Sequence, residues 1–366
     1  MNARLKPAAA PDLSSAQGLA ALEARLREDL ERLCLPAQDW LVRPADDPVL
    51  DVAIVGGGMA GLAAAAQLWL LGVRRIRVFD RNPVDEAGPW VTHARMETLR
   101  SPKHLVGPAI GLPSLTFRAW YEAQFGKSGW EALDRIPRTQ WQDYLNWFRK
   151  VLSLPVSHGV QVEAIRAEPQ SSSRVASGAA LIRFDVVSNA NAAEQEADDG
   201  AAPGRQQLLA RHLVLATGMD GIGGAAIPAL ADAIPRDRWQ HSSEFIDFAA
   251  MQGHRIGIVG GGDSALDAAA TALEAGAASV DVFVRGRDFA RINYWKAFAH
   301  PGHYLGFAAM SPQARQPMLD FLKSQKVPPA LGTVRRVARF SNITVHFDSS
   351  LESLAVDAEG AVLITT

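Results

Sequence analysis

The sequence contains very little cysteine. Of its 366 residues a single one, Cys34, is a cysteine. One thiol excludes a disulfide framework, a zinc site built from several cysteines and the dithiol pair that disulfide reductases use. Candidate metal ligands are scarce as well, because His300 and His303 have no third ligand at a suitable spacing. We interpret these histidines as loop residues and expect no metal.

The sequence also lacks an excess of charge of either sign. It has 37 lysines and arginines against 39 aspartates and glutamates, a net charge of −2. Such a balance provides no field for nucleic acid or for an anionic membrane surface. Hydrophobic residues make up 48% and charged residues 21%, as is typical of globular proteins. We therefore expect no nucleic-acid partner and no membrane partner.

Targeting and membrane-spanning segments are missing too. Residues 1–10 are followed by no apolar stretch of signal-peptide length. Residues 52–73 carry no charge and are numerous enough to cross a membrane, but glycines divide them into a strand-like and a helix-like part. We interpret this stretch as a buried strand, turn and helix, and we expect a cytoplasmic protein.

Two βαβ units, about 200 residues apart, organise the chain. The first comprises a strand at 50–55, a helix at 61–71 and a strand at 75–79, and the second a strand at 255–259, a helix at 264–275 and a strand at 279–284. Further predicted elements are an amphipathic helix over 19–33, a helix at 138–152, strands at 159–165, 181–187, 207–216, 335–340, 343–347 and 361–366, and loops at 168–178 and 188–206.

The first unit contains a glycine pattern that is typical of phosphate binding. Gly56, Gly58 and Gly61 match G-x-G-x-x-G between a strand and a helix. The first glycine permits a tight turn, the second lets the backbone approach a pyrophosphate, and the third lets helix and strand pack closely. Asp80 stands at the end of the next strand, about 20 residues after the glycine turn, and is followed by Arg81. Its carboxylate can accept from ribose hydroxyls and would repel a 2′-phosphate.

The second unit repeats the glycine pattern with a different ending. Gly260 and Gly262 match, and Ala265 takes the third place, which the pattern allows. No acid ends the second strand; Arg285 and Arg287 stand there instead, where a 2′-phosphate needs guanidinium groups. The sequence therefore favours NADP over NAD. The candidate residues at this turn are Gly260, Gly262, Asp263, Ser264, Arg285 and Arg287.

Beyond the glycine turns, further segments resemble the superfamily of flavin-containing and N-hydroxylating monooxygenases. They are Gly88-x-Trp90, Thr98 to Lys103, Ile136-Pro137-Arg138 leading to Tyr144-Leu145, His212 to Gly218 with its Ala-Thr-Gly end at Thr217 and Gly218, and Gln240 to Phe245. The resemblance covers residues 50–366 and implies that Trp90, Thr217 and Gly218 contact a flavin. It also implies an α/β fold of two Rossmann-like dinucleotide-binding domains, with the NADP domain inserted in the FAD domain.

The resemblance predicts a division of the chain into four parts. We expect an N-terminal helical extension over 1–49, a FAD-binding domain over 50–250, an NADP-binding domain over 251–334 and a return to the FAD domain over 335–366. The family closes its FAD domain with another strand and a helix that touches the flavin. We expect that piece to be missing from the sequence, which ends at Thr366.

The sequence departs from the family pattern at informative positions. Pro235 and Asp237 replace the first residues of the F-x-G-x-x-x-H-x-x-x-F/Y fingerprint, so that His241 and Phe245 alone carry it. Arg100 stands where typical flavin-containing monooxygenases have an asparagine. We expect Arg100 and Lys103 to be catalytic residues that stabilise charge near the flavin, although a surface pair beside a proline turn explains them equally well on sequence alone.

These features together predict a FAD-dependent, NADPH-consuming monooxygenase. The resemblance implies that hydride passes from NADPH to FAD, that the reduced flavin forms a C4a-(hydro)peroxide with O₂, and that one oxygen atom enters a small organic substrate. The expected partners are this substrate and O₂. A homodimer is the oligomeric state that we consider. Two alternatives stay open: an NADPH-dependent flavin reductase without oxygen insertion, and a flavoprotein that only binds nucleotides.

Overall fold

A computed structural model describes residues 15–44, 47–167, 181–188, 204–221 and 223–366. Contacts divide the chain into two compact units. The first comprises residues 1–92 and 102–224, and the second residues 93–101 and 225–366. The loops predicted at 168–178 and 188–206 lie outside the described residues, except that residue 188 and residues 204–206 belong to strands. No helix of the described segments is long and apolar enough to cross a membrane.

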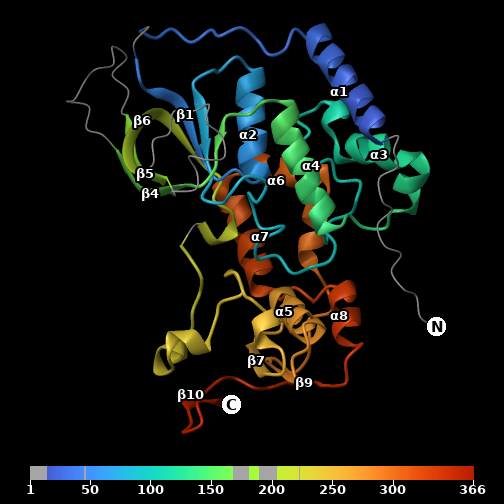
Figure 1. Ribbon diagram of the computed structural model, residues 1–366, viewed down its shortest axis with the longest axis vertical. Coiled ribbons are helices and arrows are strands. Elements are labelled where there is room, and N and C mark those ends of the chain that lie inside the picture. Colours follow the sequence, from blue (N-terminus) through green and yellow to red (C-terminus); the bar gives the residue numbers. More distant parts are fainter. Residues whose placement is uncertain (1–14, 45–46, 168–180, 189–203, 222) are drawn as a thin grey trace. The chain divides into compact units, whose positions relative to one another are not determined.

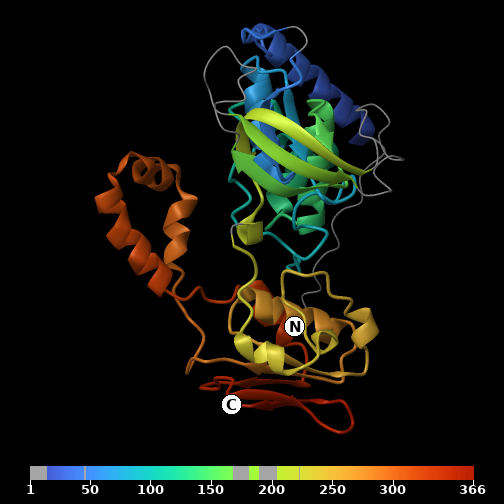
Figure 2. The same cartoon turned by 90° about the vertical axis from the view of Figure 1, so that its left-hand side faces the viewer.

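A mixed sheet forms the centre of the first unit (Figure 1). Its strands run in the order β3-β2-β1-β6-β5-β4, with bounds β1 Leu50–Val55, β2 Ile76–Phe79, β3 Val156–Ser157, β4 Val160–Ala167, β5 Ile182–Ser188 and β6 Gly204–Leu215. Strand β1 lies parallel to both β2 and β6, whereas β4, β5 and β6 pair antiparallel. Figure 2 shows β4 to β6 as long strands that curve together.

Helices complete the first unit. They are α1 Ser15–Arg32, α2 Met59–Leu70, α3 Phe117–Ala132 and α4 Arg138–Val151. Helix α4 forms because Trp141, Tyr144, Leu145 and Phe148 recur at helical spacing, and all four are buried. Phe117 of α3 packs edge-on against Tyr144, with ring centroids 5.4 Å apart. An aromatic core therefore joins α3 to α4.

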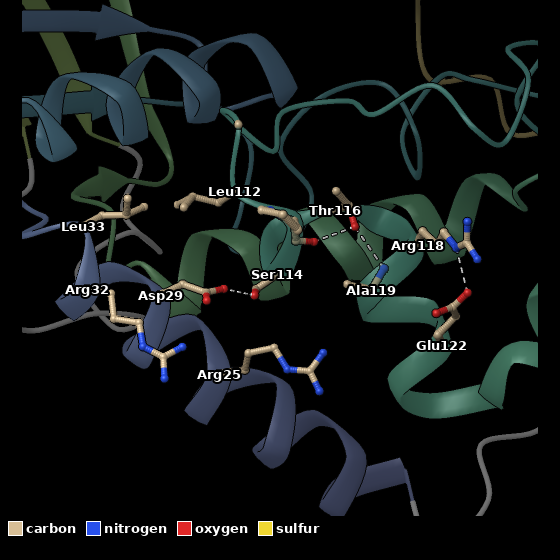
Figure 3. Close-up of a pocket in the computed structure, with 12 residues that line it drawn as sticks. Arg25, Asp29, Arg32, Leu33, Leu112, Ser114, Thr116, Arg118, Ala119 and Glu122 are labelled. Carbon is tan, nitrogen blue, oxygen red and sulfur yellow. Dashed lines mark hydrogen bonds and ion pairs between the residues drawn. The ribbon is translucent and has the colours of Figure 1, made fainter.

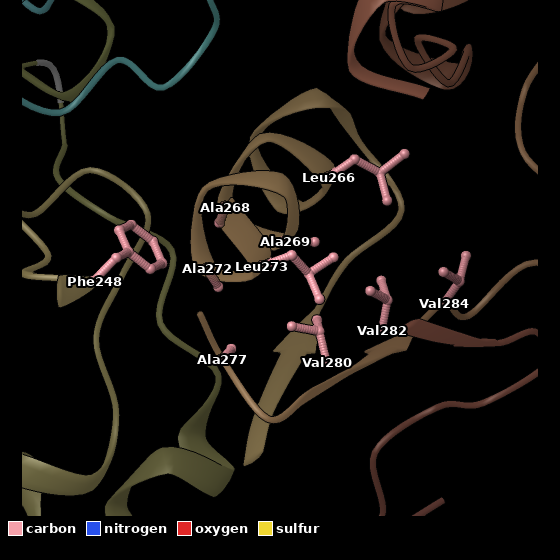
Figure 4. Close-up of a cluster of buried hydrophobic side chains, with 10 residues drawn as sticks. All are labelled: Phe248, Leu266, Ala268, Ala269, Ala272, Leu273, Ala277, Val280, Val282 and Val284. Carbon is pink, nitrogen blue, oxygen red and sulfur yellow. The ribbon is translucent and has the colours of Figure 1, made fainter. Parts of the chain in front are cut away.

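The second unit is built on a parallel sheet of the order β7-β8-β9. Its elements are β7 Arg255–Val259, α5 Asp263–Glu274, β8 Ser279–Phe283, α6 Pro301–Ala309, α7 Pro312–Ser324, α8 Leu331–Val337, β9 Ile343–His346, β10 Ser353–Val356 and β11 Val362–Thr365. Figure 4 shows Leu273 of α5 pointing toward Val280 of β8. Both βαβ units predicted from the sequence are thus confirmed as elements.

The end of the chain differs from expectation in two ways. The strand predicted at 335–340 is wrong, because residues 331–337 form helix α8, in which Val334 and Val337 pack on the core beneath α5. In addition, β9 pairs with β8, although we expected residues 335–366 to return to the first domain. The Asn342 side chain fixes the start of β9 by donating to the carbonyls of Ala277 and Ala278, each at 3.1 Å.

Candidate dinucleotide sites

The first glycine turn has the geometry that its sequence predicts. Gly56 adopts φ +105° and its N–H donates to Phe79 O at 2.8 Å, which closes the turn at the end of β1. A Cβ at Gly61 would lie 1.8 Å from Gly56 O, so that only a glycine lets α2 start this close to β1. The tight turn and the close packing of helix on strand are both present.

A second predicted motif lies against the first glycine turn. Gly58 precedes α2, and a Cβ there would have Gly88 Cα as its nearest neighbour, at 3.6 Å. The Gly88-x-Trp90 segment, 30 residues away in the sequence, therefore lies against the turn. The Trp90 Nε1–H is buried and has no hydrogen-bond partner among the described residues. Arg138, from the Pro-x-Arg segment, donates to Trp90 O and so connects a third predicted motif to this place.

Asp80 has a role that the sequence did not reveal. Its side chain is buried, with Oδ2 accepting from Gly57 N at 2.7 Å and Oδ1 accepting from Asn82 N at 2.8 Å. The carboxylate thus holds the glycine turn and the end of β2 together. Each oxygen keeps a further lone pair with which it could accept from a ribose hydroxyl. Arg81 is exposed beside it.

Strand β6 brings its Ala-Thr-Gly end to the same turn. Ala216 N donates to Val55 O at 2.8 Å, and a Cβ at Gly56 would lie 3.4 Å from Thr217 N. Gly218 adopts φ +76°, which favours glycine at this position. Residues from four separate stretches of the chain therefore meet at the carboxyl end of β1.

The second glycine turn repeats this geometry. Gly260 adopts φ +130°, and its N–H donates to Phe283 O at 2.9 Å. No atom lies within 4 Å of a Cβ built on Gly262, so that the start of α5 is open. Ser264 is exposed in the first turn of that helix. An accessible helix N-terminus, reached through a glycine without a side chain, is what a pyrophosphate at this position requires.

The two arginines at the end of the second βαβ unit are accessible. Arg285 and Arg287 lie two and four residues after the end of β8 and are both exposed. The Arg287 side chain is 92% exposed, and its Nε lies 3.7 Å from Asp348 Oδ1. A pairing at that distance and exposure is weak, so both guanidinium groups could turn toward a phosphate.

Arg100 lies in an ion-pair cluster of the second unit. Its Nε lies 3.1 Å from Asp263 Oδ2, and its Nη2 donates to Asp267 Oδ2. Burial raises the pKa of Asp267, while the Thr333 hydroxyl and the guanidinium groups of Arg100 and Arg336 oppose that rise. Asp263 Oδ1 also accepts from Ala330 N at 2.6 Å. The catalytic role expected for Arg100 stays a prediction.

Lys103 has structural partners in the first unit. Its Nζ donates to Trp130 O at 2.6 Å and to Leu133 O at 2.5 Å, and it lies 4.9 Å from the centroid of the Trp130 ring. A lysine that binds the last carbonyls of a helix stabilises the helix C-terminus, here that of α3. These contacts account for Lys103 without catalysis, and the catalytic role expected for it also stays a prediction.

A separate hollow of about 570 Å³ lies between α1 and the start of α3 (Figure 3). The Ser114 hydroxyl donates to Asp29 across it, and Arg25, Arg32 and Arg118 line its rim. None of the residues predicted for nucleotide binding or catalysis lines this hollow. Among the described residues there is no group of three histidine, cysteine, aspartate or glutamate side chains arranged to hold a metal ion.

Comparison with known proteins places this geometry in a family. Residues 130–328 match the family of L-lysine 6-monooxygenases and L-ornithine 5-monooxygenases. Over 335 residues the chain is 40% identical to the FAD-dependent urate hydroxylase of Xanthomonas campestris pv. campestris, a match that covers 90% of this chain and 66% of that protein. The chain thus spans slightly less than two thirds of this relative's length.

Solved structures show the same fold. The cadaverine monooxygenase of desferrioxamine biosynthesis from Erwinia amylovora, bound to FAD, matches with a TM-score of 0.64 and 17% identity over 87% of this chain and 73% of that one. The Kutzneria sp. 744 ornithine N-hydroxylase, with reduced FAD, NADP⁺ and L-ornithine, matches with a TM-score of 0.62 and 17% identity over 87% of this chain and 79% of that one. The fold is therefore α/β with Rossmann-like units. The chain belongs to the L-lysine 6-monooxygenase/L-ornithine 5-monooxygenase family.

Proposed function

We propose that the protein is a FAD-dependent, NADPH-consuming monooxygenase that transfers one oxygen atom of O₂ to a small nitrogen-containing substrate. The observation that carries this proposal is the pair of glycine turns, one at the end of β1 and one at the end of β7, each with a first glycine at positive φ. Family membership supports the monooxygenase reaction, since the relatives are named for ornithine, lysine, cadaverine and urate.

The first turn fits a flavin dinucleotide. Gly58 N-terminal to α2 would take the pyrophosphate, Asp80 would accept from the ribose, and Trp90 offers a buried N–H without a partner among the described residues. The flavin, when bound, would accept hydride from NADPH and pass electrons to O₂. The protein's contribution is binding, orientation and the exclusion of water.

The second turn fits NADPH. Gly260 and Gly262 would face its pyrophosphate, and Arg285 and Arg287 would bind the 2′-phosphate through charge-assisted hydrogen bonds. Such donors distinguish NADPH from NADH, because NADH has a hydroxyl in place of the phosphate.

The test of the reaction follows three quantities at once. Purified protein loaded with FAD is mixed with NADPH under air and offered L-ornithine, L-lysine, cadaverine or urate, while NADPH consumed, H₂O₂ released and hydroxylated product are measured. A monooxygenase forms product in proportion to NADPH with one of these substrates. NADPH consumption matched entirely by H₂O₂ with all of them would favour the reductase, and no flavin reduction at all would favour a nucleotide-binding protein.

The test of the flavin site uses a matched pair of glycine variants. Gly58→Ala has room in the protein itself, at 3.6 Å from Gly88 Cα, but fills the cradle and should abolish FAD binding without unfolding the chain. Gly332→Ala, on the exposed surface of α8 with no atom within 4 Å, serves as the control and should retain FAD. Full flavin content in folded Gly58→Ala would contradict the assignment.

A further inference from the structure

The second glycine turn contains an electrostatic conflict. Asp263 is the first residue of α5, directly after Gly262. An acid in this place stabilises the helix dipole, but it also puts a negative charge beside the amides that a pyrophosphate would use. Because Asp263 Oδ1 accepts from Ala330 N at 2.6 Å, the carboxylate is held in place and cannot swing away. Its side chain is 15% exposed, which limits screening by water.

Arg100 compensates this charge. Its guanidinium bridges the two carboxylates one turn apart on α5, with Nε 3.1 Å from Asp263 Oδ2 and Nη2 bonded to Asp267 Oδ2. Asp267 has a second cation, Arg336, whose Nη1 lies 3.4 Å from Oδ1. Within the part of the chain that the structure describes, Arg100 is the cation that pairs with Asp263.

The segment that delivers Arg100 is fixed to the second unit. Residues 93–101 follow the Gly88-x-Trp90 segment of the first unit, yet their contacts place them in the second. Arg95 donates to Ser242 O at 2.5 Å and to Glu244 O at 2.8 Å, and Arg336 donates to Arg95 O at 2.8 Å. These bonds fix the segment to residues 242–244 and to α8, and the ion pairs of Arg100 fix it to α5. No local sequence signal connects the segment to either helix.

We propose that Arg100 is a positioning residue for the nucleotide at the second glycine turn, and that it neutralises Asp263 so that the start of α5 can accept a pyrophosphate. This inference rests on the proposed NADPH site. It gives Arg100 a different task from the one expected from sequence, since Arg100 acts through Asp263 on the binding of the nucleotide and touches no reacting atom.

The experiment measures the affinity of FAD-loaded protein for NADP⁺ by isothermal titration calorimetry. Arg100→Gln should weaken binding about tenfold, which is the lower end of the effect that one charge has on another at such distances. Arg100→Lys should restore part of the loss. Arg118→Gln, which removes an arginine paired with Glu122 at 2.7 Å on α3, is the matched control and should leave the affinity unchanged.

The double variant separates charge compensation from a merely structural role. Arg100→Gln combined with Asp263→Asn should bind NADP⁺ close to the wild-type affinity, because the charge that repels the phosphate is gone. Asp263→Asn alone keeps its Oδ1 acceptor for Ala330 N and should bind at least as tightly as the wild type. FAD content should be the same in all variants.

Three outcomes would overturn the inference. Wild-type affinity in Arg100→Gln would show that Asp263 does not repel the ligand. A double variant as weak as Arg100→Gln would show that the loss comes from a disturbed structure. Wild-type protein that retains FAD but takes up no NADP⁺ would refute the proposed NADPH site itself and the inference with it, and is recognised before any variant is made.

Discussion

The contact between Gly61 and Gly56 yields a prediction whose size follows from the structure. In Gly61→Ala the new Cβ would lie 1.8 Å from Gly56 O, whereas Cβ atoms essentially never approach closer than 3.0 Å. The gap must open by at least 3.0 − 1.8 = 1.2 Å. The obstacle is a backbone carbonyl in a turn anchored by the hydrogen bond from Gly56 N to Phe79 O, so that α2 has to move away from β1.

Overpacking of this kind costs about 1–3 kcal/mol. Since 1 kcal/mol shifts the melting temperature of a unit of this size by roughly 2–4 °C, we expect Gly61→Ala to melt about 2–12 °C below the wild type. Flavin content should fall as well, because the amides at the start of α2 move with the helix. Thermal unfolding followed by circular dichroism, together with the flavin absorbance of the purified protein, measures both effects. Gly332→Ala should lower neither, and an unchanged melting temperature with full flavin content in Gly61→Ala would refute the close packing of α2 on β1.

The remaining predictions concern a buried hydroxyl, a buried cation and nucleotide choice. Tyr144→Phe removes the hydrogen bond to Leu115 O at 2.6 Å and should cost about 1–3 kcal/mol in urea unfolding. Burial raises the pKa of Tyr144, so the phenol loses its proton at lower pH in the unfolded chain than in the folded protein, and the free energy of unfolding of the wild type should fall above about pH 10. The same decrease with pH in Tyr144→Phe would contradict this. Arg336→Met leaves the carboxylates of Asp267 and Glu274 without their shared cation and should cost about 3–5 kcal/mol, and a urea midpoint like that of the wild type would contradict the cluster. Arg285→Ala should reduce the preference for NADPH over NADH about tenfold in KM while KM for NADH stays unchanged.

Local patterns predicted most of the architecture. Strand β7 begins and ends where the sequence indicates, and α4 differs by one residue at its end. The glycine turns were found because their function depends on three positions within six residues, a spacing that is visible in a single sequence. The helix at 331–337 was missed, although its apolar residues Leu331, Val334 and Val337 recur every third residue, as a helix requires and a strand does not.

Contacts between distant residues could not be predicted in the same way. The hydrogen bond from Gly57 N to Asp80 and the ion pair between Arg100 and Asp263 join residues that no periodic pattern relates. The pairing of β9 with β8 likewise depends on where the intervening residues 284–342 return the chain. A sequence marks these residues as charged or apolar, but their partners are decided by the assembled fold.

The second unit includes one short stretch, residues 93–101, that lies in the sequence between the two parts of the first unit. The polypeptide consequently passes between the units three times, after residues 92, 101 and 224. A fragment excised at residue 225 would lose Arg95 and Arg100 and expose the acidic side of α5. A gene segment that encodes residues 225–366 alone therefore does not encode the whole second unit, and any chimera that uses this unit has to include the nine residues 93–101 as well.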